Sequence, residues 1–176
     1  MNINISMDWS SALDAIKETV GPNGWLTEDA DLEPYVTEWR KILRGNCRMV
    51  VRPASTEETA KVVGFCHRAG IPITPQGGNT GMVGGGVPED GIVLSTERMT
   101  AVRELGADNA TITVEAGCIL AEVQNAARDG GFLFPLSLAA EGSCHIGGNI
   151  ATNAGVFFLQ AEDGIRDLVL GLEVVL

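Results

Sequence analysis

The feature that most constrains this chain is the glycine-rich segment at 75–86, which reads Pro-Gln-Gly-Gly-Asn-Thr-Gly-Met-Val-Gly-Gly-Gly. Glycine is unfavourable inside helices and packed strands, so the segment must be a loop. It directly follows residues 71–74, which predict a strand. Consecutive backbone N–H groups in such a loop can converge on an anion; Asn79 and Thr80 add side-chain donors, and Pro75 fixes the exit of the strand. The loop is therefore predicted to bind a diphosphate.

Two common nucleotide-binding motifs do not match this loop. The sequence has no G-x-G-x-x-G, and no lysine follows the glycines, so a Rossmann domain and a P-loop NTPase are both disfavoured. An isolated glycine turn is more often a surface connection than a binding site. A second segment of small residues at 142–155, which lies about 60 positions further on and predicts tight turns with a short helix, favours a binding role.

The stretch from 49 to 74 has the pattern of strand, helix and strand. Met49 to Val51 form a short apolar run, Ser55 and Glu58 make an S-x-x-E capping box, and Gly70 is a typical helix stop. The helix is predicted to bury one apolar face, made of Val62, Val63, Phe65, Cys66 and Ala69. This pattern predicts a βαβ unit with parallel strands and a right-handed crossover.

Further periodic segments complete the predicted secondary structure. They are a helix at 10–20, strands at 92–95 and 111–115, a helix at 119–128 with Leu120, Val123 and Ala127 on its buried face, and a last apolar strand at 168–176. Residues 23–47 lack a regular pattern and are expected to form an irregular packed arm. Because the last strand runs to the final residue, we expect the chain to be a truncated product.

Composition narrows the possible partners. The chain has 12 basic and 23 acidic side chains and a net charge of −11, which disfavours nucleic acid and anionic lipid as ligands. It contains neither a long apolar run nor a signal peptide, so we expect a cytoplasmic protein without a membrane span. The four cysteines form no C-x-x-C pair and are expected to be reduced structural thiols, and no metal site is expected within the chain.

Several motifs together resemble one flavoprotein family. They are VRPASTEE at 51–58, PQGGNTGMVGG at 75–85, LST-RM at 94–99, AGC at 116–118, FPL at 134–136, GSCHIGGNIATNAG at 142–155 and VLGLEVVL at 169–176. The family includes D-2-hydroxyglutarate dehydrogenase, D-lactate dehydrogenase and the flavin subunit of glycolate oxidase. The resemblance covers roughly residues 35–176 and is closest to the 2-hydroxyglutarate members.

The resemblance implies an α+β fold of the PCMH type, with FAD bound noncovalently in a cleft between two α/β subdomains. The expected division is an N-terminal helix and arm at 1–47, a first FAD-binding subdomain at 48–90, and a second at 91–176. Gly77 to Gly81 are implied to wrap the pyrophosphate, and the cofactor-binding residues implied in this loop are Pro75, Gly77, Gly78, Asn79, Thr80, Gly81 and Met82. Those implied at the ribityl chain and flavin ring are Pro135, Gly142, Ser143, Gly147, Gly148, Asn149, Asn153 and Ala154, and Val174 is implied to meet the cofactor through its backbone.

The family chemistry is hydride transfer from C2 of a D-2-hydroxy acid to N5 of the flavin. Its substrate-binding groups, and the metal-binding histidines of many members, lie in a C-terminal cap domain that this chain lacks. We therefore assign no catalytic residue and expect the fragment alone to be inactive. The alternatives are another FAD-dependent oxidoreductase on the same scaffold and an inactive or noncatalytic product.

Three details qualify the resemblance. After Asn153-Ala154-Gly155 the family continues with glycine and, later, Arg-Tyr-Gly, whereas this chain reads VFFLQAEDGI at 156–165, which is expected to disturb the cofactor wall. Ser137 and Glu141 stand where close relatives tend to carry Asp and Lys. His145 is expected to be a hydrogen-bonded structural residue, because its HIGGN context matches noncovalent members of the family.

Overall fold

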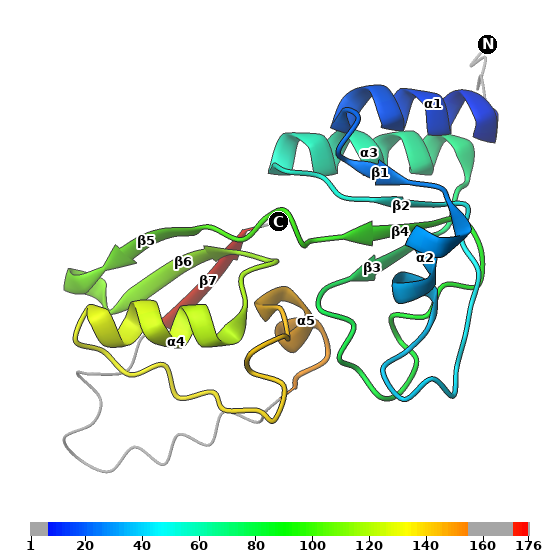
Figure 1. The fold of residues 1–176 in the computed structure, drawn as a ribbon. Helices are drawn as coiled ribbons and strands as arrows, with labels where there is room; N and C mark the ends of the chain where they lie inside the picture. The colour runs from blue at the N-terminus through cyan, green and yellow to red at the C-terminus, as the bar shows by residue number, and fades with distance from the viewer. Residues whose placement is uncertain (1–6, 155–170, 176) are drawn as a thin grey trace. The chain divides into compact units, whose positions relative to one another are not determined.

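The computed structural model describes residues 7–154 and 171–175 of the chain. It divides into two compact units, Met1–Arg98 and Met99–Leu176 (Figure 1). No helix within the described ranges is both long and apolar enough to cross a membrane. The four cysteines are buried and unpaired, as the sequence predicted.

The first unit is a four-stranded sheet with helices on both faces (Figure 1). Its elements are α1 (Trp9–Val20), β1 (Trp25–Leu26), α2 (Asp29–Val36), β2 (Met49–Val51), α3 (Thr56–Ala69), β3 (Ile73–Gln76) and β4 (Ile92–Ser95). The strand order is β1-β2-β4-β3, with β1 antiparallel to β2 and the other pairs parallel. The predicted parallel βαβ unit is therefore present, but β4 lies between its two strands.

Alternation along the strands decides which helix covers which face. Met49 and Val51 pack with α1 and α3, whereas Val50 packs with Leu32 and Val36 of α2. Successive side chains of a strand point to opposite faces, so a short apolar run can fill two cores. Helix α1 was predicted at 10–20 and is confirmed. Val63, which was predicted on the buried face of α3, is instead exposed, because only Val62 and Cys66 of that helix point fully inward.

Both ends of α3 follow the predicted signals. The Ser55 hydroxyl accepts the N–H of Glu58 at 3.2 Å, and the Glu58 carboxylate accepts the N–H of Ala54 at 2.8 Å. Gly70 has φ 65° and ends the helix in the left-handed region. The Ile71 N–H then bonds back to the Cys66 carbonyl at 2.9 Å, so β3 begins at Ile73 instead of the predicted residue 71.

The sequence-based division of this half of the chain was wrong at two points. Strand β4 pairs with both β2 and β3, so residues 91–98 belong to the first unit and the boundary lies after Arg98, not after residue 90. Residues 1–47 are not a separate part, because α1 packs on α3 and β1 extends the sheet beside β2. The expected irregular arm contains the regular helix α2.

The second unit is a three-stranded sheet in the order β5-β6-β7 (Figure 1). Its elements are β5 (Val102–Gly106), the 3-10 turn Ala107–Asn109, β6 (Thr111–Glu115), α4 (Leu120–Asp129), α5 (Ile146–Ala151) and β7 (Gly171–Val175). The α4 face of Leu120, Val123 and Ala127 is fully buried, which confirms the prediction. Strand β5 was not predicted, since its Val102–Glu104 half is exposed and carries no apolar alternation.

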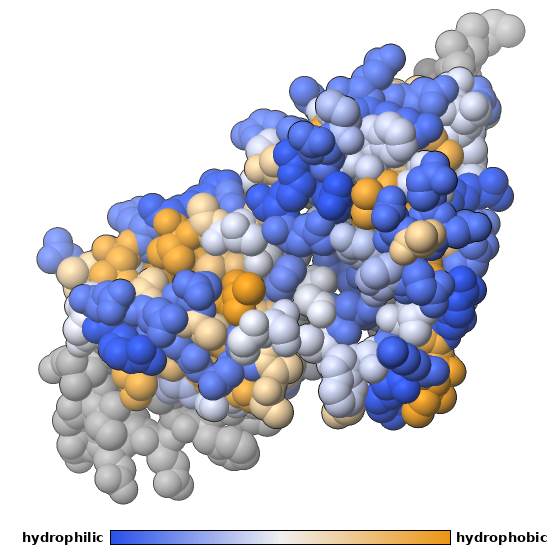
Figure 2. Space-filling model, in the orientation of Figure 1, coloured by the Kyte–Doolittle hydropathy of each residue, from blue (hydrophilic) through white to orange (hydrophobic). Residues whose placement is uncertain are grey.

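The final strand also appears, as β7 parallel to β6, with Val174 opposite Val114. Residues 168–170 and 176 of the predicted strand lie outside the described residues. Polar side chains cover most of the first unit's face drawn in Figure 2. The unit also exposes the large apolar side chains of Trp39, Ile42 and Val83, and Val83 is 89% exposed.

Candidate functional site

The glycine loop leaves the first sheet at the carboxyl end of β3. Its parallel neighbour β4 ends beside it, with Gln76 of β3 in register with Ser95 of β4. Ligands of open α/β sheets bind beyond the carboxyl ends of such strands. Pro75 lies in β3, which is an edge strand of the sheet and therefore tolerates proline.

The backbone of this loop is available to an anion. Within the described part of the chain, the N–H groups of residues 77–83 donate to no protein oxygen. A Cβ added to Gly81 would meet no atom within 4 Å, so the space in front of this glycine is open. The loop also contains no lysine or arginine between 75 and 91. Within the loop itself, attraction for a phosphate must therefore come from backbone dipoles and the Thr80 hydroxyl, as in other anion-binding loops.

The side chain of Asn79 has a different role from the one predicted. Its amide nitrogen donates to the carbonyl oxygens of Pro34 and Thr37, both at 2.9 Å. Both amide hydrogens are thereby used, so the expected side-chain donor for phosphate is not offered. Gln76 makes a similar pair of bonds, to the carbonyl oxygens of Tyr35 and Gly86, both at 2.8 Å. The loop is thus fastened to the last turn of α2 and the residues that follow it.

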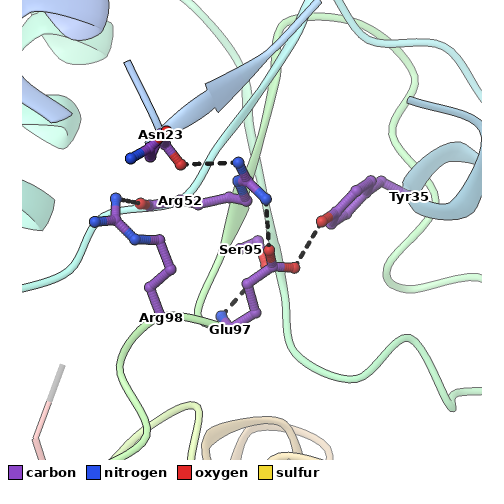
Figure 3. Close-up of polar contacts among 6 residues, drawn as sticks. All are labelled: Asn23, Tyr35, Arg52, Ser95, Glu97 and Arg98. Carbon is purple, nitrogen blue, oxygen red and sulfur yellow. Dashed lines mark hydrogen bonds and ion pairs between the residues drawn. The ribbon is translucent and has the colours of Figure 1, made fainter. Parts of the chain in front are cut away.

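The ends of β2 and β4 meet α2 at a carboxylate (Figure 3). Glu97, just beyond β4, accepts the Tyr35 hydroxyl at 2.6 Å and the Arg52 guanidinium at 3.0 Å. Arg52 follows β2 and also donates to the Asn23 carbonyl at 2.8 Å. Burial, followed by the hydrogen bond to Glu97, raises the pKa of Tyr35 to about 12. This cluster keeps Tyr35 protonated and α2 fixed at the carboxyl edge of the sheet.

The second glycine segment forms a turn, helix α5 and another turn in the second unit. Its fold depends on two backbone bonds to the connection between β6 and α4: Ile146 N–H to the Cys118 carbonyl and Gly147 N–H to the Ala116 carbonyl, both at 2.9 Å. His145 is the N-terminal flanking residue of α5 and forms a β-bridge with Ile119. Buried Cys144 accepts the Asn149 amide at 3.4 Å, which fits the packing role expected for that cysteine.

Neighbouring glycines in α5 have different surroundings. A Cβ on Gly147 would lie 2.9 Å from the Ala116 Cβ and 3.0 Å from its carbonyl oxygen, so this glycine permits close packing. A Cβ on Gly148 or on Gly142 would meet nothing within 4 Å. Gly142 and Gly148 therefore present open backbone of the kind a ligand can approach, while the N–H of Gly147 is already bonded to protein.

The remaining predicted site residues of the second unit lie as follows. Ser143 is exposed and its N–H bonds to Ala140, Asn153 has a left-handed φ of 50°, and Ala154 is half-buried with its N–H on the Asn149 carbonyl. Pro135 lines an open groove of about 560 Å³ together with Phe132, Leu136 and Glu141. Val174 contributes backbone to β7. Within 142–154, exposed residues such as Gly142 and Ser143 therefore alternate with the buried residues Cys144, Ile146 and Asn149.

The chain departs from the family pattern at Ser137, at Glu141 and at 156–165, and the structure describes only the first two of these. Glu141 lies within 3.3 Å of the Ser137 hydroxyl and 3.4 Å of the Gln124 amide, so both polar neighbours donate to its charge. The departure at 156–165 lies outside the described residues. Sequence reasoning missed Tyr35, Gln76 and Glu97, whose roles depend on contacts across about 40 to 60 positions.

A comparison with protein families shows which family contains the glycine loop at 75–86 and the second glycine segment at 142–155. The family described as FAD binding domain matches residues 47–176, which include both glycine segments. The chain belongs to the FAD-binding domain family. FAD is therefore its cofactor, as the sequence predicted, while noncovalent attachment stays a prediction.

Relatives support this membership. The chain is 42% identical over 163 residues to the mitochondrial D-2-hydroxyglutarate dehydrogenase of Bos taurus, covering 92% of this chain and 30% of that protein. It thus spans about a third of the length of the relative it matches. The mitochondrial name of that relative gives no support to the cytoplasmic expectation.

Solved structures confirm the fold class. An alkyldihydroxyacetonephosphate synthase structure matches with a TM-score of 0.75 at 18% identity, covering 85% of this chain and 33% of that one. A p-cresol methylhydroxylase structure matches with a TM-score of 0.68 at 20% identity, covering 81% and 29%. The chain therefore has the PCMH-type α+β fold of the FAD-binding domain family.

Proposed function

We propose that this chain is the FAD-binding part of a flavin-dependent dehydrogenase that oxidises D-2-hydroxy acids, of the D-2-hydroxyglutarate or D-lactate class. The observation that carries the proposal is the glycine loop at 77–83 at the carboxyl end of β3, whose consecutive N–H groups donate to no oxygen atom in the part of the chain that the structure describes. The identity to a D-2-hydroxyglutarate dehydrogenase over nine-tenths of the chain supports the substrate class.

The two segments suit different parts of the cofactor. The loop of residues 77–82 would bind the diphosphate through backbone N–H groups, with the Thr80 hydroxyl as a further donor. The open backbone at Gly142 and Gly148 suits close approach of the ribityl chain and flavin ring, with Pro135, Ser143, Asn149, Asn153, Ala154 and the Val174 backbone as the other contacts that we propose. Gly147 supports this surface by letting α5 pack closely on Ala116.

Bound FAD supplies a hydride acceptor at N5. The contribution of this chain is to bind and orient that group; it supplies no residue to which we assign a proton transfer. Recognition of the substrate carboxylate, and any metal ion, belongs to a further domain of a longer protein. The electron acceptor is not assigned.

A second candidate function is a different oxidation on the same scaffold. Two of the solved structures that match this fold carry the names of a synthase and a methylhydroxylase, so the fold alone does not determine the substrate. A noncatalytic FAD-binding role is the remaining alternative.

Turnover by the full-length protein that contains this chain separates these possibilities. D-2-hydroxyglutarate, D-lactate and glycolate would each be supplied with an artificial electron acceptor, and the L-enantiomers would serve as controls. We expect turnover with at least one D-2-hydroxy acid and bleaching of the visible flavin band in the absence of acceptor. A flavin-loaded protein that is reduced by none of them would refute the dehydrogenase proposal.

A further inference from the structure

The last turn of α2 and the residue after it, 34–37, are held from several directions, and we name them the α2 turn. Asn79 binds the carbonyl oxygens of Pro34 and Thr37, and Gln76 binds that of Tyr35. Glu97 binds the hydroxyl of Tyr35. Side chains from β3, from the glycine loop and from the end of β4 therefore converge on one helical turn (Figure 3 shows the Tyr35 part).

Asn79 is the only one of these groups that lies within the 77–83 run. Its backbone has a left-handed φ of 49°, a conformation that asparagine tolerates better than most residues. With both amide hydrogens bonded to the α2 turn, the atom left over is the amide oxygen, an acceptor that would repel a phosphate oxygen. The side chain is therefore arranged to hold the loop and not to bind the diphosphate.

Holding the loop matters because its N–H groups donate to no oxygen atom of the described residues. A free glycine-rich loop samples many conformations, and ordering it on binding reduces affinity. A loop that is already fixed before binding avoids that cost. Tyr35 acts one step further away, since its hydroxyl ties the α2 turn to Glu97, and Arg52 in turn binds that carboxylate.

We propose that Asn79 is a positioning residue which, by bonding to the α2 turn, presets the 77–83 loop for the diphosphate of the dinucleotide, and that Tyr35 supports the same arrangement through Glu97. This inference rests on the proposed FAD-binding function. Under this inference, α2 contributes to the affinity for FAD although no residue of α2 contacts FAD in our proposal.

The test combines two readouts on the 176-residue chain. Affinity for FAD is measured by flavin fluorescence, and backbone order parameters of residues 78–86 are measured by ¹⁵N relaxation without FAD. The variants are Asn79→Ala, Asn79→Asp and Tyr35→Phe. Asp31→Asn, an exposed change in the same helix, is the matched control.

We expect Asn79→Ala to weaken FAD binding about tenfold and Tyr35→Phe about threefold, from the usual strength of such hydrogen bonds. In the free chain, order parameters of the loop should fall from about 0.85 to below about 0.6 in both Asn79 variants, and by a smaller amount in Tyr35→Phe. Asp31→Asn should change neither quantity. Tyr35→Phe is the more informative variant, because it alters neither the loop sequence nor its charge.

Two results would overturn the inference. Weaker FAD binding by Asn79→Ala with an equally rigid free loop would mean that Asn79 contacts the cofactor directly. Unchanged affinity in Asn79→Ala would mean that the anchoring has no consequence for binding. If the unaltered chain binds no FAD, the proposed function fails, while the order parameters still decide whether the α2 turn fixes the loop.

Discussion

Gly147 and Gly148 are adjacent in α5, and the structure predicts opposite consequences when each is replaced by alanine. At Gly147 the new Cβ would lie 2.9 Å from the Ala116 Cβ and 3.0 Å from the Ala116 oxygen. Neither atom belongs to a side chain that can rotate away. Such overpacking costs about 1–3 kcal/mol, and the better helix propensity of alanine offsets about 1 kcal/mol of it. The unfolding free energy should therefore fall by up to about 2 kcal/mol, towards the upper end of that range because the obstructing atoms are rigid.

At Gly148 the same change meets open space, so only the propensity gain of up to about 1 kcal/mol applies. Stability should therefore stay equal or rise. FAD affinity should nevertheless fall by about tenfold, or 1.4 kcal/mol, since the methyl group occupies the surface proposed for close approach of the cofactor. The two effects separate packing from binding at neighbouring positions.

Urea unfolding of the FAD-free chains and FAD titration of the same preparations give both quantities. If Gly148→Ala destabilises the chain more than Gly147→Ala does, the packing contacts of the two glycines are misassigned. If Gly148→Ala binds FAD as tightly as the unaltered chain does, Gly148 does not lie at the cofactor.

Three further predictions test separate parts of the structure. Ser55→Ala should remove about 1 kcal/mol of stability by deleting the cap of α3, measured by urea unfolding; an unchanged midpoint would contradict the capping assignment. Tyr35 is the only tyrosine and its pKa is raised to about 12, so phenolate absorbance should show that it is mostly protonated at about pH 11. The stability contributed by the hydrogen bond from Tyr35 to Glu97 should be present below the ordinary tyrosine pKa near 10 and be lost as the pH rises toward 12. Ionisation of Tyr35 near pH 10 in the folded chain would contradict the Glu97 contact. All four cysteines are buried, and burial raises the pKa of Cys66 to about 11. A thiol reagent should therefore label the four cysteines slowly in the folded chain and rapidly in denaturant. Fast labelling without denaturant would contradict their burial.

Local signals in the sequence were sufficient for much of the secondary structure. The Ser55–Glu58 box, the Gly70 stop and the apolar face of α4 each depend on residues within one or two helical turns, and each appears as predicted. The glycine loop was also placed correctly after its strand. These features follow from backbone sterics and periodicity, which the sequence states directly.

Long-range contacts explain what the sequence did not reveal. In the sheet, β4 lies between β2 and β3. The sequence could not predict this strand order, because the three strands have similar apolar runs. Helix α2 was missed because it contains Pro34 and has little apolar periodicity. The different roles of Gly147 and Gly148 arise from Ala116, some thirty positions earlier, and the anchoring role of Asn79 arises from carbonyl groups of α2.

The central claim is that the backbone amides of residues 77–83 bind FAD through its diphosphate. Titration of the ¹⁵N-labelled chain with FAD, followed amide by amide, tests it most directly. We predict that the amides of this loop, including that of Gly81, shift with a single dissociation constant and saturate at one FAD per chain. An absence of shifts in this loop at FAD concentrations up to about 1 mM would contradict it.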